Sequence, residues 1–437
     1  MPFGLNPSQV AFYNVVILGL SFLLLFTAFQ TCGMVQTDIL NHAKLPGVGY
    51  NSLAIIYAVF AFANWIAPSV VALLGAKWSM LASAVVYTGF VASFFHPIPG
   101  VIFALSALLG IAAAVIWTAQ GNFLTMNSSQ ETMGRNSGLF WAMLQCSLLF
   151  GNLFFFLEMK GKDDITTKVR VTVFIVLTAV SGAGVLTFLL LVKPPEELQG
   201  PTQIQEFEES SESRANLRDA LGAFVRSVKL LFTKEMLMLS ITNFYTGIEL
   251  TFFSGVYGTA ISNTNMFGYN SNSYIGISGM LIGAGEIVGG LLFGILGKKT
   301  IKYGRDPIIL LGYLVHMAAF YLIFYNMPEV SPLQETNDNS YMNPPLVEVA
   351  FTCSFLLGFG DACFNTQIYS LLGSYFKSDS ASAFALFKFI QSSAAAIAFA
   401  YSNHLHLQWQ LLALVLTGTM GALSFFYVEH HPPQNEI

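Results

Sequence analysis

The sequence predicts an all-α membrane protein with twelve transmembrane helices arranged in two six-helix bundles. Of its 437 residues, 54% are hydrophobic and only 10% are charged, whereas a soluble protein carries roughly 25% charged residues. The mean hydropathy is +0.61. Long apolar runs recur along the chain, and one long polar break divides them into two equal sets. Lipid is therefore the expected solvent of most of the surface.

Each predicted helix is a run of about 20 apolar residues, the length that crosses roughly 30 Å of hydrocarbon. Most runs are separated by short segments with Gly, Pro, Asn or charge, such as His96–Gly100. No positive charge precedes the first run, which is too long for a signal peptide, so we predict a membrane helix there. The predicted helices cover residues 10–36, 50–74, 78–95, 99–126, 136–158, 170–192, 237–261, 274–297, 306–327, 347–374, 380–402 and 408–428.

The polar break, Lys193–Glu235, predicts a linker between the bundles. Its first part is acidic, rich in Ser, Gln and Glu and poor in apolar residues, which is typical of disorder. Its second part, Ala215–Phe232, has apolar residues at helical spacing with basic residues between them, which predicts an amphipathic helix on the inner membrane surface. We therefore divide the chain into residues 1–193, 194–235 and 236–437.

The two halves have weakly similar segments. The segment "GLFWAMLQCS", with Gln145, aligns with "FALFKFIQSS", with Gln391, and Gln120 aligns with Gln367 at nearly the same offset. A six-plus-six repeat is common among transporters. Chance similarity between apolar segments is the alternative.

Basic residues set the expected orientation, because Lys and Arg gather in cytoplasmic loops. In the second half the basic loop residues all lie on one side: Lys298, Lys299, Lys302, Arg305 and Lys377. The first half alone points the other way. The second half is unambiguous, so we predict that both termini are cytoplasmic.

The segment "FGILGKKTIKYGRDP", Phe293–Pro307, joins the eighth and ninth predicted helices. It resembles the signature loop of the major facilitator superfamily, with small residues that permit close helix contact and basic residues suited to helix C-termini. An ordinary basic loop is the alternative, and the first-half counterpart at Gly75–Met80 keeps little of the pattern. The candidate residues are Gly294, Gly297, Lys298, Gly304 and Arg305.

Longer motifs resemble the uncoordinated-93-like branch of that superfamily over residues 10–430, and within it one member in particular. These motifs lie at Leu25–Gly33, Gly110–Asn122, Gly134–Asn152, Glu249–Thr259, Ser354–Gln367 and Phe384–Gln391. The resemblance implies a multi-pass membrane protein with twelve helices in two bundles and no enzymatic activity. It implies no substrate, because better-known relatives are a potassium-channel regulatory subunit and an escort for Toll-like receptors.

Four charged residues lie near the middle of predicted helices: Glu249, Glu286, Asp361 and Lys388. A charge at that depth costs at least about 2.5 kcal/mol, so each should face the bundle interior and have a partner. We expect Lys388 to face at least one of the acids, with Asp361 the first choice. Three acids against one base suit a proton-coupled carrier. Equally, the charged residues could only hold helices together. This second role is favoured for Glu286 because glycines at close-packing spacing surround it.

Polar and aromatic residues at similar depths are candidates to line a cavity, although aromatic packing is the commoner role of such tryptophans. We interpret His316 as a packing histidine rather than a proton relay. The candidates are Gln30, Trp117, Gln120, Trp141, Gln145, Asn365 and Gln391.

Other classes of function are not supported by the sequence. The net charge of −5 gives no basic surface for nucleic acid. The four cysteines fall in apolar runs, at spacings that suit neither zinc nor disulfides. We see no catalytic triad, metal site or nucleotide loop, so we expect no enzyme activity and no cofactor. We predict a secondary transporter of a small solute in the lipid bilayer, with proton coupling as its candidate energy source. The alternative is a regulatory or trafficking subunit of another membrane protein.

Overall fold

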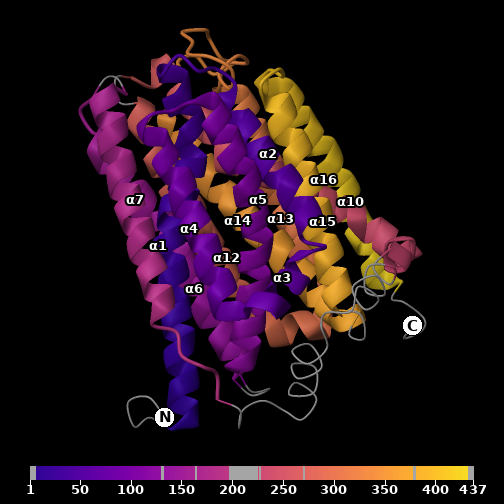
Figure 1. The fold of residues 1–437 in the computed structure, drawn as a ribbon. Helices are drawn as coiled ribbons and strands as arrows, with labels where there is room; N and C mark the ends of the chain where they lie inside the picture. The colour runs from indigo at the N-terminus through magenta and orange to yellow at the C-terminus, as the bar shows by residue number, and fades with distance from the viewer. Residues whose placement is uncertain are drawn as a thin grey trace.

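The computed structural model describes residues 6–128, 132–162, 165–195, 225, 228–268, 271–376 and 380–431, and these are almost entirely helical. The long helices run along one common direction (Figure 1). The first half consists of α1 Pro7–His42, α2 Val48–Ala63, α3 Ala67–Leu74, α4 Ala76–Ala92, α5 Pro99–Met126, α6 Met133–Met159 and α7 Thr167–Leu189. The second half consists of α10 Lys234–Thr251, η4 Phe252–Val256, α11 Tyr257–Ser262, α12 Ser271–Tyr303, α13 Asp306–Asn326, α14 Val347–Tyr375, α15 Ser380–Ser402 and α16 Leu407–His430.

Most of the predicted helices are present with similar bounds. Ten helices of the described residues are long and apolar enough to cross a membrane, or eleven if the bent pair α2 and α3 is one span. Helix α10 is outside this count; it contains Lys234, Glu235 and Glu249. An all-helical membrane protein is thus confirmed, and the number twelve is not. Most of the predicted linker, with its amphipathic helix, lies outside the described residues.

The prediction of one continuous helix at residues 50–74 is wrong. It is broken between Ala63 and Ala67, and α2 and α3 meet at a bend of 73°. Pro68 lies in the first turn of α3. It has no N–H to bond the carbonyl of Asn64, and its ring crowds that carbonyl, so the helix cannot continue through it.

The predicted helix at 237–261 is also irregular. Residues Phe252–Val256 form a π-helix between α10 and α11. Insertions of this kind are frequent at functional sites, and this one begins three residues after Glu249. Just before it, α10 lies very close to α15: a Cβ on Gly247 would be 2.2 Å from the carbonyl oxygen of Gln391.

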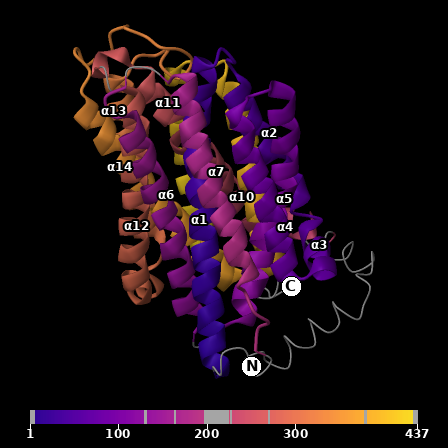
Figure 2. The same ribbon diagram turned by 60° about the vertical axis from the view of Figure 1, so that its left-hand side comes forward.

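The two halves meet along two helix pairs, α6 with α12 and α2 with α15. Figure 2 shows α6 beside α12. Glycines make this approach possible, since a Cβ on Gly276 would lie 2.6 Å from the backbone oxygen of Asn152. Small residues at helix interfaces allow such close backbone contact in membranes.

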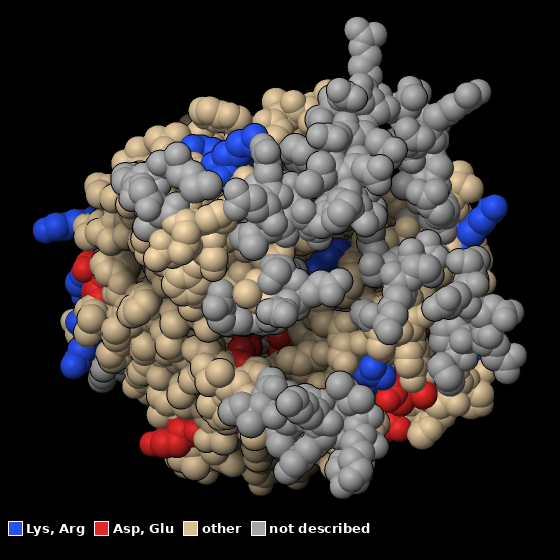
Figure 3. Space-filling model, turned by 90° about the horizontal axis from the view of Figure 1, so that it is seen from below, with Lys and Arg blue, Asp and Glu red and all other residues tan. Residues whose placement is uncertain are grey.

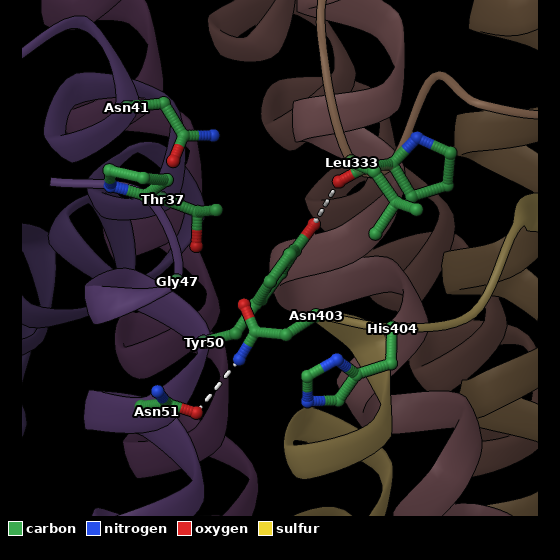
Figure 4. A pocket seen from close by; sticks show the side chains of 10 residues that line it. Thr37, Asn41, Gly47, Tyr50, Asn51, Leu333, Asn403 and His404 are labelled. Carbon is green, nitrogen blue, oxygen red and sulfur yellow. Dashed lines mark hydrogen bonds between the residues drawn. The ribbon is translucent and has the colours of Figure 1, made fainter. Parts of the chain in front are cut away.

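Both ends of the described chain lie at the same end of the molecule, which we call the terminal end (Figure 1). At the opposite, far end the halves are joined by hydrogen bonds. The Tyr50 hydroxyl donates to Pro332 O at 3.2 Å, and Asn403 Nδ2 donates to Asn51 Oδ1 at 2.8 Å. These residues border a pocket of about 350 Å³ (Figure 4).

Further contacts join the two halves at the far end. His42 Nε2 lies 3.3 Å from Glu335 Oε1, on the connection between α13 and α14. The rings of Tyr57 and Phe399 stack with centroids 5.5 Å apart. The terminal end, by contrast, is hollowed, and acidic side chains are visible deep inside the hollow (Figure 3). Within the described part of the chain, the structure is therefore closed at the far end and open at the terminal end.

Candidate functional site

Glu249 lies on α10, inside the second half. Its Oε1 atom is 3.5 Å from Nε2 of His316 on α13, and both side chains are 1% exposed. A buried carboxyl group needs a partner, because burial without one is costly. The prediction that Glu249 faces the bundle interior agrees with this position.

His316 connects three helices around Glu249. Its Nε2 atom lies 3.1 Å from the carbonyl oxygen of Leu357 on α14, and its Nδ1 atom hydrogen-bonds the hydroxyl of Tyr245 on α10. A carbonyl only accepts, so Nε2 carries the hydrogen and Nδ1 accepts from Tyr245. The imidazole also stacks on Phe364 with centroids 5.8 Å apart. His316 therefore packs between helices, as predicted, and also contacts a buried acid, which the sequence analysis missed.

The three predicted acids are neighbours. Glu249 lies within hydrogen-bonding reach of Asp361 on α14, and Glu286, on α12, acts electrostatically on Glu249 and interacts with Asp361. Asn365 Nδ2 donates to Asp361 Oδ1 at 2.6 Å. Two carboxyl groups can hydrogen-bond each other only when one carries a proton. The pair Glu249–Asp361 is therefore suited to hold one proton between its members.

Glu286 links this acidic cluster, Glu249, Glu286 and Asp361, to the other half of the molecule. Its carboxyl group hydrogen-bonds the side chain of Gln145 on α6. Because α6 packs against α12, this bond crosses the interface between the halves. A change of charge at Glu286 would alter its interaction with Gln145 and so the contact between α6 and α12.

The expected direct ion pair of Lys388 is not observed. Among the residues that the structure describes, no carboxylate oxygen lies within 4.0 Å of its ammonium group, which instead donates to Gln391 Oε1 at 3.0 Å. The ammonium also lies 4.8 Å from the ring centre of Phe387 and 5.6 Å from that of Tyr369. Lys388 still acts on Asp361 through its charge. The offset along α14 and α15 keeps the two side chains apart.

Gln391 extends this contact to α10, since its Nε2 donates to the Thr246 hydroxyl at 3.2 Å. The bond between Lys388 and Gln391 spans three residues, and that between Asp361 and Asn365 spans four. Both are the spacings at which side chains share a helix face.

The first half contributes the aromatic and amide candidates. Trp117 of α5 stacks on Trp141 of α6 with centroids 5.8 Å apart, and it also packs edge-on against Phe22 of the first-half core. The Ser147 hydroxyl hydrogen-bonds Gln30 Oε1 of α1, and Gln120 is buried in α5. Gln145 interacts with one of the acids, Glu286, whereas Trp117 belongs mainly to the aromatic packing.

The signature loop begins later than predicted. Helix α12 continues to Tyr303, and the chain turns at Gly304, whose φ is +80°; glycine adopts this conformation without strain. Lys298 is therefore helical rather than in a loop, and the helix ends just before Gly304. The side chains at 293–303, and so the surroundings of Gly294, Gly297 and Lys298, lie outside the described residues.

Arg305 binds the ends of two other helices. Its Nη1 pairs with Glu429 Oε2 of α16 at 2.8 Å, and its Nε donates to the Ser370 hydroxyl of α14 at 3.0 Å. The guanidinium also lies 5.2 Å from the ring centre of Tyr375. Lys77 has a comparable role in the first half, where its Nζ donates to the carbonyls of Leu189 and Leu191 at the end of α7.

Comparisons with known proteins agree with this architecture. The family model described as "Ion channel regulatory protein UNC-93" matches residues 43–426. The UNC93-like protein MFSD11 of Xenopus laevis is 49% identical over 435 residues, covering 97% of each chain. This confirms the member that the motifs resembled, major facilitator superfamily domain-containing protein eleven.

More distant matches extend the comparison. The protein unc-93 homolog A of Mus musculus is 25% identical over 95% of this chain and 93% of its own length. Among solved structures, the nucleoside transporter NupG superposes with a TM-score of 0.67 at 13% identity, covering 95% of this chain and 98% of that one. At that identity the likeness shows the fold alone, which is that of major facilitator transporters.

Proposed function

The chain belongs to the UNC-93 family, and from that premise we propose that it is a secondary transporter of a small solute. The proposed transporter has twelve membrane spans in two six-helix halves. In this arrangement α10, η4 and α11 together form one span, and α2 and α3 form another. The halves rock about a site between them, so that the site opens alternately to either side.

The observation that carries this proposal is the acidic cluster inside the second half, of which Asp361 is partly exposed. Glu249 and Asp361 interact directly and could share one proton, and Glu286 interacts with both halves through Asp361 and Gln145. Proton binding at the cluster would alter the contact between α6 and α12. Such an arrangement supports coupling of a proton to the movement of the halves.

The proposed orientation places both termini in the cytoplasm, so the hollow opens inward. It rests on the basic residues of the second half, including Arg305 at the terminal end. Protease added to right-side-out vesicles should leave residues 194–235 intact, and permeabilised vesicles should be cut there. Cleavage from outside would reverse the orientation.

Uptake into proteoliposomes tests the function. Vesicles with purified protein are incubated with a metabolite mixture, with and without a pH gradient, and their contents are identified by mass spectrometry. We expect at least one solute to accumulate faster with the gradient, and Asp361→Asn to abolish that difference. Glu348→Gln, an exposed acid on the same helix, is the matched control. Folded protein that accumulates nothing above empty vesicles would contradict transport.

A second function is favoured by the description of the matching family model, which names ion-channel regulation. In that case the chain would bind another membrane protein, and the acidic cluster would pin helices together. Affinity purification from native membranes should then recover one partner in stoichiometric amount, and Asp361→Asn should not reduce its recovery. No enzymatic activity is part of either proposal.

A further inference from the structure

The site has an excess of acidic groups that its own base does not neutralise directly. Among the residues that the structure describes, Lys388 is the base that acts on the cluster of Glu249, Glu286 and Asp361. This ammonium is held by Gln391 Oε1 at 3.0 Å and lies over the ring of Phe387. It is therefore bonded to an amide, and among the described residues Asp361 has no cation within ion-pair distance.

A second observation concerns Glu249 itself. Its side chain is 1% exposed, and its Oε1 atom has no hydrogen-bond donor among the residues that the structure describes. The Nε2 hydrogen of His316 is directed to Leu357 O. A buried carboxylate oxygen without a donor is costly, and this one belongs to the group that bonds Asp361, which is partly exposed. The pair therefore offers acceptor capacity that the protein leaves unused.

The first half supplies an exposed aromatic side chain on the helix that carries Gln145. Trp141 is 41% exposed although it lies inside the length of α6. It is four residues before Gln145, so the two share a helix face, and Gln145 reaches Glu286 across the interface between the halves. The exposed indole therefore faces the space between the halves. Stacking on Trp117 at 5.8 Å keeps its ring in place.

An indole face opposite carboxylates is the combination that recognises a positively charged organic group, because tryptophan attracts cations most strongly among the aromatic residues. We infer that the hollow binds a small organic ammonium cation, with its charged group between Asp361 and Glu286 and its apolar groups on Trp141. The inference rests on the proposed function, since it names the class of solute carried. A neutral solute of the same shape would leave the carboxylates without a counter-charge.

The test compares a cation with its neutral isostere. Purified full-length protein in nanodiscs is titrated with choline, and separately with 3,3-dimethyl-1-butanol, which has the same shape without the charge. Binding is followed by thermal unfolding and by tryptophan fluorescence. Sodium chloride at matched ionic strength is a third arm. We expect saturable stabilisation by choline and none by the alcohol or by sodium.

Variants locate the effect. Asp361→Asn and Trp141→Leu should each weaken choline binding about tenfold or more, whereas Glu348→Gln and Trp409→Leu, which change exposed residues elsewhere, should not. Equal effects of choline and the alcohol, a response to sodium alone, or unchanged binding in Asp361→Asn would overturn the inference. If choline does not bind while another solute is taken up with a pH gradient, the inference of a cation site is wrong and the proposal of transport is not affected. Binding without any flux would leave the cation site standing and contradict transport.

Discussion

Glu249 of α10 and His316 of α13 lie 3.5 Å apart, measured from Oε1 to Nε2, at a place where both side chains are 1% exposed. The histidine is bonded on both nitrogens, to Leu357 O and to the Tyr245 hydroxyl. It therefore fixes the distance between α10, α13 and α14 beside the acidic cluster. Gly360 leaves the ring its space, since a Cβ there would be 2.1 Å from Nε2.

The first prediction concerns this histidine. His316→Leu should destabilise the protein, because the Tyr245 hydroxyl and the Leu357 carbonyl lose their partner, at about 1–3 kcal/mol for each stranded buried group. Thermal unfolding in nanodiscs measures the loss. His404→Leu, at an exposed turn between α15 and α16, is the control and should change little. Equal melting temperatures for the two variants would show that the contacts of His316 contribute nothing.

The second prediction concerns Arg305 at the terminal end. Arg305→Ala leaves Glu429 without its cation, and Glu429 is only 9% exposed. Breaking a buried pair in this way costs about 3–5 kcal/mol, so we expect a large fall in the unfolding temperature. Lys162→Ala is a matched control, because the ion pair between Lys162 and Glu158 is 39% and 24% exposed and such pairs contribute about 0–1 kcal/mol. If Arg305→Ala and Lys162→Ala lowered the unfolding temperature by the same small amount, the ion pair between Arg305 and Glu429 would not contribute to stability as a buried pair does.

The third prediction concerns Lys388. Lys388→Met removes the charge that acts on Asp361 and strands Gln391 Oε1, so it should lower stability. Adding Asp361→Asn should recover part of the loss, because one uncompensated negative charge is removed as well. A double-mutant cycle of unfolding free energies measures the coupling. If Glu286→Gln rescued Lys388→Met better than Asp361→Asn did, the partner acid would be Glu286.

Sequence predicts the structure of this protein well where one physical signal dominates. The length of an apolar run is set by the thickness of the bilayer, so α5, α14 and α15 were predicted almost to the residue. Spacing along a helix gives local contacts in the same way, as Lys388 with Gln391 shows. The break before Pro68 was visible in principle, because proline ends helices, but the continuous apolar run outweighed it.

The rest depends on how helices are rotated against one another. Sequence position placed Glu249 near the middle of its predicted helix but gave no indication that it faces His316. The same limit explains Lys388, whose distance from Asp361 depends on the offset between α14 and α15. The π-helix after Glu249 has no distinctive residue pattern. Such contacts arise from packing over the whole molecule rather than from any local signal.

The fourth prediction concerns closure of the far end. Tyr50→Phe removes the hydroxyl that donates to Pro332 O, and this contact joins the two halves. We expect the far end to open more often, because a hydrogen bond between the halves is lost. A cysteine introduced at Thr37, which lines the far-end pocket (Figure 4), should then react faster with a hydrophilic thiol reagent. Tyr341→Phe, at an exposed position, is the control, and equal labelling rates would contradict a role for Tyr50.

The last prediction uses two glycines of α12 that differ only in what surrounds them. A Cβ on Gly276 would lie 2.6 Å from Asn152 O and 2.8 Å from Phe156 N, both backbone atoms of α6, whereas a Cβ on Gly290 meets nothing within 4 Å. Alanine favours a helix over glycine by about 1 kcal/mol, so Gly290→Ala should leave stability unchanged or raise it. Gly276→Ala should lower it by about 1–3 kcal/mol, the usual cost of overpacking, because backbone cannot move aside as a flexible side chain can.

The unfolding temperatures of Gly276→Ala and Gly290→Ala in nanodiscs measure this difference in stability. The same substitution should thus have opposite signs at two sites of one helix, a difference that helix propensity cannot produce. If Gly276→Ala were as stable as Gly290→Ala, α6 and α12 would have room to separate. The Gln145–Glu286 bond would then lose its support, because that bond requires the two helices to stay close. A stable Gly276→Ala variant with normal uptake would therefore remove the interface between α6 and α12 from the transport mechanism.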